Sequence, residues 1–300
     1  MIQSLKLAIL LLAILLGSCQ YNVNKVAETD DIDNTILRIA IIGDAEPKPL
    51  AEFPNMAAAI EQINTLAQTL PIDFVIGVGD IAHKGTEIQY EAATKVLQKL
   101  TIPFYPIMGN EEHGSTVERY LHYARQWNSR IDSTRYVLEY DEIAFVFASP
   151  DFSRDFEDSG ALWILEQLQR FAPKPVVLVV HGAQQGVYPE NAEKGISNQI
   201  FKDQVISQAN LAVVISGDLH MDMDRVDHSK QIDHVHYLHI SALERTKIPD
   251  ETNHTPMFRV MTIGKDGEVT IDTYAVGETN PRKEHAFSFT LILKDRELNQ

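Results

Sequence analysis

Residues 72–80 read IDFVIGVGD, a short apolar run that ends on the pair Gly79-Asp80. Runs of this kind, rich in β-branched and aromatic residues, are typical of strands that are buried on both faces of a sheet. Four further runs are built in the same way and also end on residues that can bind a metal ion. They are Ile36–Ile42 before Asp44 and Glu46, Ile102–Met108 before Asn110, Val176–Val180 before His181, and Leu211–Ile215 before Asp218 and His220.

Helical patterns separate these runs, so the sequence predicts an α/β fold. Apolar residues recur at helical spacing over 60–70, 88–100, 117–127 and 162–168, and Ser115 is the expected N-cap of the third helix. Residues 135–149 indicate a hairpin, and the pattern turns mainly to strands from Val235 onward, with a possible edge strand over 287–293. Ligands of such sheets bind beyond the carboxyl ends of the parallel strands, which would collect the polar residues in one pocket.

The first residues of the chain predict a signal peptide over 1–18. Lys6 precedes an unbroken apolar run over 7–16, which is too short for most membrane spans, and the small residues Gly17 and Ser18 follow. The next residue, Cys19, is the only cysteine and so has no disulfide partner within the chain. The segment 16–19 resembles the lipobox of bacterial lipoproteins, in which the cysteine is acylated. The alternative is a plain signal peptide or an uncleaved anchor.

On this reading Cys19 is a lipid anchor, and the protein lies at the bacterial cell envelope on its periplasmic or extracellular face. Gln20 stands where an aspartate is associated with inner-membrane retention, which favours the outer membrane. Residues 19–35 are polar and acidic, as expected of a flexible tether, and residues 36–300 are long enough for one large domain. The formal charge of −16 excludes nucleic acid as a partner of the general surface.

The order of these strand-end motifs resembles that of the calcineurin-like metallophosphoesterases. The resemblance runs from about Ile36 to Ile240 and implies a four-layer α/β/β/α sandwich with two mixed, largely parallel central sheets. It implies a hydrolase that cleaves a small phosphomonoester or phosphodiester with a metal-bound hydroxide, and two divalent ions bridged by Asp80. By position, one ion would be held by Asp44, Glu46 and His220, and the other by Asn110, His181 and Asp218.

Three positions depart from the family pattern, because Glu46, Glu111 and Asp218 stand where the family usually has histidine. Carboxylates at 46 and 218 can still bind a divalent ion, which favours retained metal binding. Oxygen-rich shells prefer hard ions, so we expect Mn²⁺, Mg²⁺ or Fe in preference to Ca²⁺ or Zn²⁺. Counting ligand carboxylates alone, two divalent ions would leave a nearly neutral centre with a weaker attraction for an anionic ester.

Glu111, Glu112 and His113 are the candidate catalytic residues. In the family the histidine at the position of Glu111 acts on the leaving-group oxygen, and a glutamate could donate a proton there only if its pKa were raised. A crowded acidic pocket favours such a shift. The alternative is that these are loop side chains in solvent, or caps of the helix that begins near Ser115.

Two functions from different classes therefore remain open. The first is a lipid-anchored, extracytoplasmic metallophosphoesterase, and the second is a catalytically inactive relative that serves as a metal-binding or interaction module at the envelope. The retained aspartates and histidines favour the enzyme, and the three departures favour the module. The sequence identifies neither the substrate nor the oligomeric state, because specificity would lie in loops such as 182–198 and 224–233.

Overall fold

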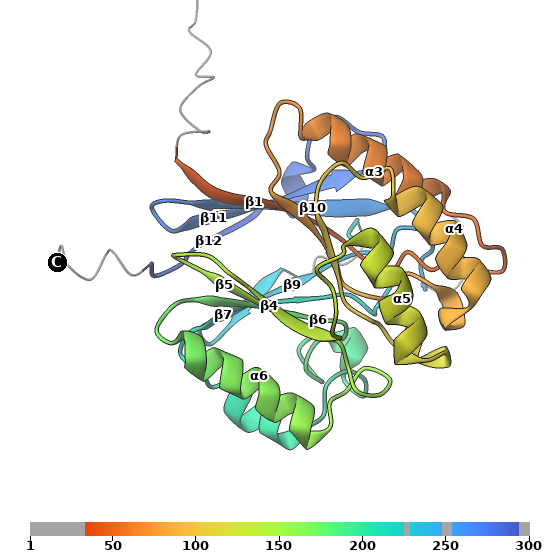
Figure 1. Ribbon diagram of the computed structural model, residues 1–300. Coiled ribbons are helices and arrows are strands. Elements are labelled where there is room, and N and C mark those ends of the chain that lie inside the picture. Colours follow the sequence, from red (N-terminus) through yellow and green to blue (C-terminus); the bar gives the residue numbers. More distant parts are fainter. Residues whose placement is uncertain (1–33, 225–228, 248–253, 294–300) are drawn as a thin grey trace, which may run out of the picture. The chain divides into compact units, whose positions relative to one another are not determined.

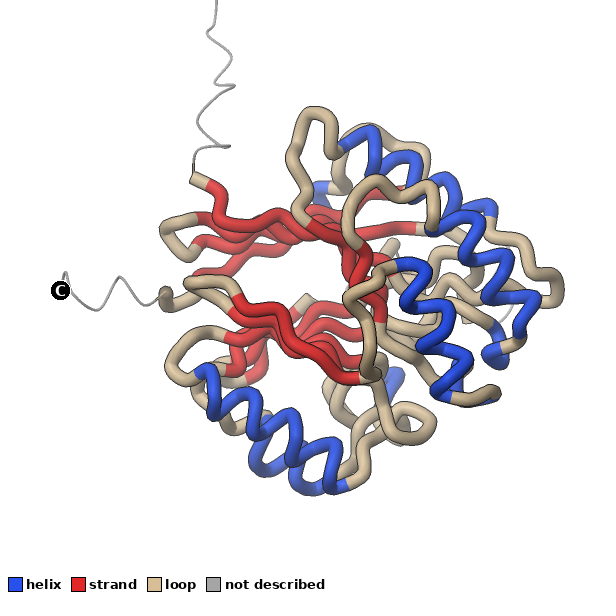
Figure 2. Tube along the Cα trace, in the orientation of Figure 1, coloured by secondary structure: helices blue, strands red, loops and turns tan. Residues whose placement is uncertain are grey.

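The computed structural model describes residues 34–224, 229–247 and 254–293. The predicted signal peptide, Cys19 and nearly all of the predicted tether lie outside these residues. Two six-stranded mixed sheets pack face to face, with helices on their outer faces (Figure 1, Figure 2). This arrangement confirms the predicted α/β/β/α sandwich.

The first sheet has the strand order β12-β11-β10-β1-β2-β3. Its parallel part consists of β1 (Thr35–Ile42), β2 (Phe74–Gly77) and β3 (Phe104–Pro106). Antiparallel pairing adds β10 (Met257–Gly264), β11 (Glu268–Ala275) and, as the predicted edge strand, β12 (Phe287–Thr290). In β1, Ile39 and Ile41 face the second sheet while Ala40 and Ile42 face the outer helices, so the strand is buried on both sides.

The second sheet has the strand order β4-β5-β6-β7-β9-β8. Parallel pairing joins β5 (Ala144–Ala148), β6 (Val176–Val180), β7 (Leu211–Ser216) and β9 (Val235–His239). The edges are the antiparallel strands β4 (Arg135–Glu139) and β8 (Lys230–Ile232). The parallel strands β6 and β7 are therefore central. The residues that follow them lie together at the carboxyl ends of the parallel strands.

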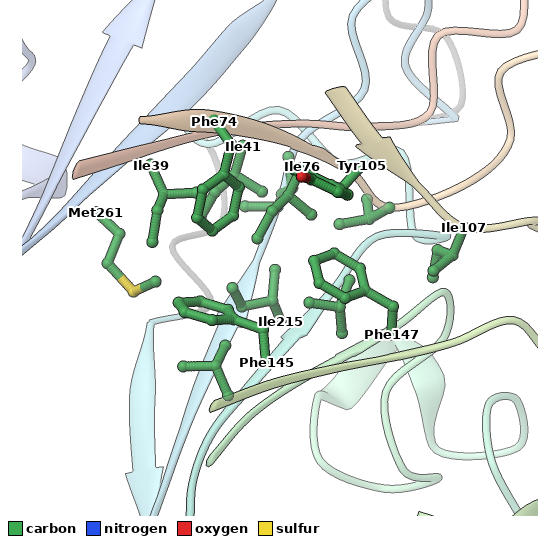
Figure 3. Close-up of a cluster of buried hydrophobic side chains, with 14 of the residues drawn as sticks. Ile39, Ile41, Phe74, Ile76, Tyr105, Ile107, Phe145, Phe147, Ile215 and Met261 are labelled. Atoms are coloured by element: carbon green, nitrogen blue, oxygen red, sulfur yellow. The ribbon is translucent and has the colours of Figure 1, made fainter. Parts of the chain in front are cut away.

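The main core fills the space between the two sheets. Phe74 meets Phe145 edge to face with ring centroids 5.3 Å apart, and Ile41, Ile76 and Ile215 surround them (Figure 3). Interlocked aromatic and branched side chains of this kind pack at the density of an organic crystal. The core thus fixes the two sheets against each other and so fixes the relative positions of their strand ends.

Helices complete the outer layers and the connections. The helices are α3 (Pro54–Leu66), α4 (Glu87–Leu97), α5 (Val117–Trp127) and α6 (Asp158–Phe171). Short helical turns are η1 (His83–Gly85), η2 (Glu112–Gly114), η3 (Pro189–Asn191), η4 (Phe201–Val205) and η5 (Lys283–His285). The predicted N-cap of α5 is wrong by one residue, because the Thr116 hydroxyl accepts the bond from the Arg119 amide. Ser115 instead accepts from the Arg119 guanidinium.

Candidate metal centre

The predicted ligands meet where the parallel strands of both sheets end. The Asp44 amide donates to the Gly79 carbonyl at 3.2 Å, which joins the segments after β1 and β2. The Asp218 amide donates to the Asp44 carboxylate at 2.9 Å, which joins the first sheet to the second. Asp44, Asp80, His181 and His220 are at most 1% exposed. The two sheets therefore contribute to one buried polar pocket.

Four of the predicted ligands have a left-handed backbone. The φ angles are 47° at Asp44, 51° at Asp80, 72° at Asp218 and 52° at His220. This region is unfavourable for residues other than glycine, and such conformations gather at functional sites where the surrounding fold enforces them. The turn after each strand directs these side chains back into the pocket.

Glycine next to Asp80 allows the strand ends to approach each other closely. Gly79 has a φ of 95°, and a Cβ atom there would lie 2.6 Å from the Gly109 nitrogen and 2.8 Å from His181 Nδ1. No side chain fits in that space. The pair Gly79-Asp80 is thus needed for the geometry of the pocket as well as for its chemistry.

The ligand atoms form two groups that share Asp80. One group joins Asp44, Asp80 and His220, and the other joins Asp80, His181 and Asp218, with the potential ligand atoms of each group within 4.8 Å of one another. His220 Nε2 lies 3.7 Å from Asp80 Oδ2, and His181 Nε2 lies 3.3 Å from Asp80 Oδ1. The two oxygens of Asp80 thus face different groups, as a bridging carboxylate would.

Glu46 and Asn110 complete the two groups. Glu46 Oε1 lies 3.5 Å from His220 Nε2, and Asn110 Oδ1 lies 3.2 Å from His181 Nε2. All seven predicted ligands are therefore brought together, with Glu46 beside His220 and Asn110 beside His181. Glu46 also forms a third potential group with Asp80 and Glu111.

Hydrogen bonding prepares His181 to bind a cation through one nitrogen. Its Nδ1 lies 2.8 Å from the Val78 carbonyl, to which it must donate. The remaining nitrogen, Nε2, points at the carboxylates and the Asn110 oxygen. A histidine whose other nitrogen is fixed by a carbonyl in this way has the usual arrangement of a metal ligand.

Several buried ligand atoms have no hydrogen-bond partner among the described residues. They are Glu46 Oε2, Asp80 Oδ2, Asp218 Oδ1 and both ring nitrogens of His220. Buried polar atoms that lack a partner are costly and rare, at about 1–3 kcal/mol each. Because His220 Nε2 lies 3.7 Å from Asp80 Oδ2 and most of these atoms are carboxylate oxygens, divalent cations fit the site.

The protonation equilibria of the pocket are strongly shifted. Burial and the charges of Asp80 and Asp44 raise the pKa of Glu46 to about 9. Burial opposes a charge on His181, but the neighbouring carboxylates outweigh it and raise the pKa of that ring to about 10. Both shifts show an excess of negative charge, which divalent ions would balance.

Arginine and lysine side chains also reach the pocket, and the sequence analysis missed them. Arg245 donates to Glu46 Oε1, Arg154 donates to Asp218 Oδ2 at 2.5 Å, and Lys48 donates to Glu111 Oε1 at 3.0 Å. Lys247 donates to the Asp218 carbonyl at 3.2 Å. These residues lie in irregular segments, so no periodic pattern predicts their contacts. Their position after β1, β5 and β9, at the carboxyl ends of the parallel strands, is the one feature of the sequence that could have indicated them.

Glu111 is held as an anion by its neighbours. Its Oε2 accepts from the Lys84 amide at 3.0 Å and lies 2.7 Å from His83 Nδ1, while Oε1 accepts from Lys48. Burial alone would raise its pKa, but the bonds from Lys84 and Lys48 outweigh it and lower the pKa. The raised pKa expected for a proton donor is therefore wrong for Glu111.

Glu112 has a positioning role, and its catalytic role stays a prediction. Oε1 accepts from the amides of Ile81 and Ala82, each at 2.7 Å. Oε2 accepts from the amides of Asp80 at 3.0 Å and Gly109 at 2.7 Å. The side chain is 1% exposed, so these four bonds occupy both oxygens. Glu112 therefore fixes the loop that carries Asp80 to the loop that follows β3.

His113 points away from the ligand groups toward the segment after β5. Its Nε2 lies 3.1 Å from the Pro150 carbonyl, and the ring is partly buried. Burial lowers its pKa. Among the described residues, no hydrogen bond joins His113 to any of the seven ligands. Its catalytic role stays a prediction.

Comparison with known proteins places these features in context. Residues 37–222 match the model of a family described as calcineurin-like phosphoesterase. The probable glycerophosphodiester phosphodiesterase GpdQ of Arcobacter nitrofigilis is 26% identical over 113 residues, which are 36% of this chain and 41% of that protein. The chain thus aligns with less than half of this relative.

Solved structures share the fold at low identity. A dimetal phosphatase from Danio rerio has a TM-score of 0.62 at 12% identity, over 86% of this chain and 99% of that one. Purple acid phosphatase PPD1 from yellow lupin (Lupinus luteus) seeds has a TM-score of 0.60 at 13% identity, over 85% and 53% of the two chains. These likenesses concern the fold.

Proposed function

The chain belongs to the calcineurin-like phosphoesterase family, and on that premise we propose that it is a metal-dependent hydrolase of a small phosphomonoester or phosphodiester. The observation that carries this proposal is the pair of ligand groups that share Asp80. Asp44, Glu46 and His220 would hold one divalent ion, and Asn110, His181 and Asp218 the other. Bound ions of this kind polarise a phosphoryl oxygen and activate water as a nucleophile at neutral pH.

The chain's own residues would orient the ions and the ester. His181 keeps Nε2 directed at the site because Nδ1 donates to Val78, and Glu112 holds the Asp80 loop in place. The main-chain and side-chain bonds of Glu111 keep it ionised, so a proton for the leaving group would have to come from another donor. We therefore expect the best substrates to have a good leaving group.

We propose Mn²⁺, Mg²⁺ or Fe as the ions. The ligand set contains four carboxylates and an amide oxygen, with one imidazole in each group, and hard ions prefer such oxygen-rich shells. The test is to remove metal from the purified protein with a chelator and add back Mn²⁺, Mg²⁺ or Zn²⁺. Metal content should recover, together with hydrolysis of an activated phosphomonoester or phosphodiester, and recovery should be better with Mn²⁺ or Mg²⁺ than with Zn²⁺.

An interaction module is the second candidate, and Glu111 favours it. The family usually has histidine there, whereas Lys48, Lys84 and His83 bind this carboxylate on the described chain. If the protein binds two ions per chain but hydrolyses neither class of ester with any divalent ion, it is an interaction module and the proposed hydrolase activity is wrong. If it binds no ion, the proposed enzyme fails and only an interaction module without metal remains.

We also propose that acylated Cys19 anchors the protein at the bacterial envelope, on the periplasmic or extracellular face. The support is the sequence of residues 1–19, which lie outside the described residues. Among the residues that the structure does describe, no helix is long and apolar enough to cross a membrane. Cys19→Ala should leave the chain unprocessed or release it from the membrane fraction. An unchanged mature mass and location would contradict the anchor.

A further inference from the structure

Each of the three carboxylates that replace a family histidine contacts a cationic side chain. Glu46 pairs with Arg245, Asp218 with Arg154, and Glu111 with Lys48. The partners come from distant parts of the chain, because Glu46 and Arg245 are 199 positions apart and Asp218 and Arg154 are 64 positions apart. The cations are therefore brought to these carboxylates by the fold rather than by local helical spacing.

At Asp218 the arginine contacts one oxygen and the other lies 3.7 Å from His181 Nε2. At Glu46 the oxygen that contacts the arginine is also the one that lies 3.5 Å from His220 Nε2. Arg245 takes Glu46 Oε1 and Arg154 takes Asp218 Oδ2. Glu46 Oε2 and Asp218 Oδ1 are buried and accept no hydrogen bond from the described residues. A carboxylate fixed by a guanidinium has a defined orientation. The oxygens that face the histidines, Glu46 Oε1 and Asp218 Oδ1, both belong to carboxylates held in this way.

These pairs differ from ordinary surface ion pairs. Glu46 and Asp218 are buried, whereas the side chains of Arg245 and Arg154 are 24% and 26% exposed. The charge of a buried carboxylate is screened poorly by water, so a contacting guanidinium has a strong effect on it. The arginines thus matter to the charge of the centre.

The arginines also change the charge count that the sequence suggested. Four carboxylates in the pocket, Asp44, Glu46, Asp80 and Asp218, would be neutralised by two divalent ions, leaving little attraction for phosphate. Two guanidinium groups in direct contact add two positive charges. A centre that holds two divalent ions therefore keeps a net charge of about +2, equal to that of a site with two carboxylates and two more histidines.

We propose that Arg154 and Arg245 are positioning residues that allow Asp218 and Glu46 to replace histidine as ligands. Each arginine offsets the charge that its carboxylate brings to the centre. This inference rests on the proposed metal centre. It implies that glutamate at 46 and arginine at 245 are a matched pair, and that changing one of them alone unbalances the centre.

The test is a cycle of Glu46→His, Arg245→Gln and the double variant, with Mn²⁺ and then inorganic phosphate as ligands. Arg245→Gln removes a positive charge, so the Mn²⁺-loaded protein should bind phosphate about tenfold more weakly, while Mn²⁺ affinity is equal or higher. Glu46→His removes a negative charge, so it should strengthen phosphate binding and weaken Mn²⁺ binding. The double variant, which restores the original charge, should return both close to the wild-type values.

Two further variants separate charge from structure. Arg245→Lys keeps the charge and should restore most of the phosphate affinity, whereas Arg130→Gln, at an exposed position after α5, should change neither affinity. Loss of both Mn²⁺ and phosphate binding in Arg245→Gln would indicate a merely structural role and overturn the inference. Unchanged phosphate affinity in that variant would also overturn it and leave the proposed function intact. A wild-type protein that binds no Mn²⁺ would overturn the metal centre itself.

Discussion

The space between the two sheets and the pocket at their strand ends are both buried, but they are built from opposite chemistry. Between the sheets, Phe74, Phe145 and their neighbours are apolar and pack through edge-to-face rings (Figure 3). In the pocket, Asp44 and Asp80 carry ionisable carboxyl groups, lack exposure to water and have left-handed backbones. The first region is apolar and closely packed, whereas the second combines buried polar groups with unfavourable backbone angles.

The difference shows how stability and function divide between the two regions. Burial of apolar side chains stabilises the fold, whereas buried like charges and unfavourable φ angles destabilise it. Functional sites commonly carry such a stability cost. We therefore expect substitutions in the core to lower the free energy of unfolding, and substitutions of the predicted ligands to change metal binding while affecting the metal-free fold little.

The largest effect is expected for Asp80→Asn. One carboxylate serves both ligand groups, so its loss should lower metal affinity by at least about 100-fold and remove most of the bound ions. Asparagine tolerates the left-handed backbone, so the free energy of unfolding of the metal-free variant should lie within about 1 kcal/mol of the wild-type value. Elemental analysis and urea unfolding measure the two quantities, and His181→Ala, which should lose mainly one ion, is the comparison. Equal metal content in Asp80→Asn and wild type would show that Asp80 does not bridge.

The converse experiment is Phe145→Ala in the core. Removing a fully buried ring should lower the free energy of unfolding by about 3–5 kcal/mol, because both transfer energy and contacts to Phe74 are lost. The fraction that remains folded should bind metal with unchanged affinity. A variant that is stable but binds metal weakly would contradict the division between the two regions.

Glu112→Gln tests a residue that lies beside the pocket but serves the fold. The amide of glutamine places donor hydrogens against some of the four backbone N–H groups that Glu112 accepts, which should lower the free energy of unfolding by about 2–3 kcal/mol. This loss should persist in metal-free protein, unlike the effect of Asp80→Asn. If metal-free Glu112→Gln unfolds as the wild type does, the positioning role is wrong.

The smallest effect is expected for a charged contact beside the pocket, between His254 and Asp222. Burial lowers the pKa of His254, but the bonds to Asp222 and to the Leu243 carbonyl outweigh it and raise the pKa. A raised folded-state pKa stabilises the protein fully below the unfolded-state value of about 6.5 and loses this effect as the pH rises through the folded-state pKa. His254→Gln should therefore lower the melting temperature by about 1–3 °C at pH 5.5 and by less at pH 9. If the loss in melting temperature of His254→Gln instead grew with pH, a raised pKa of His254 would be contradicted.

The sequence predicted the fold and the ligands for one physical reason. Strands such as β2 and β6 are buried on both faces, so they appear as continuous apolar runs, and the residues that follow them are fixed at one edge of each sheet. Asp80 and His181 could therefore be placed without knowing any side-chain contact. Residue type and position placed both residues in one pocket, and the family resemblance supplied their assignment to two ions.

The remainder depended on contacts that periodicity does not encode. Arg154 and Arg245 lie in irregular segments and meet carboxylates far along the chain, so their charges were left out of the sequence-based count. Glu111 and Glu112 are adjacent and chemically equivalent in the sequence. The turn that they enter directs Glu112 to buried amides and Glu111 to Lys48, which gives the two residues different roles.

The contact between Asp44 and Asp218 has a mechanical consequence. These residues are 174 positions apart and belong to different sheets, so an ion shared by Asp44, Asp80 and His220 would act as a reversible cross-link between the halves of the sandwich. A ligand that binds only the folded chain stabilises it by about 2.7 kcal/mol at one hundred times its dissociation constant. The resistance of this protein to proteases would then rise and fall with the concentration of divalent ions around it.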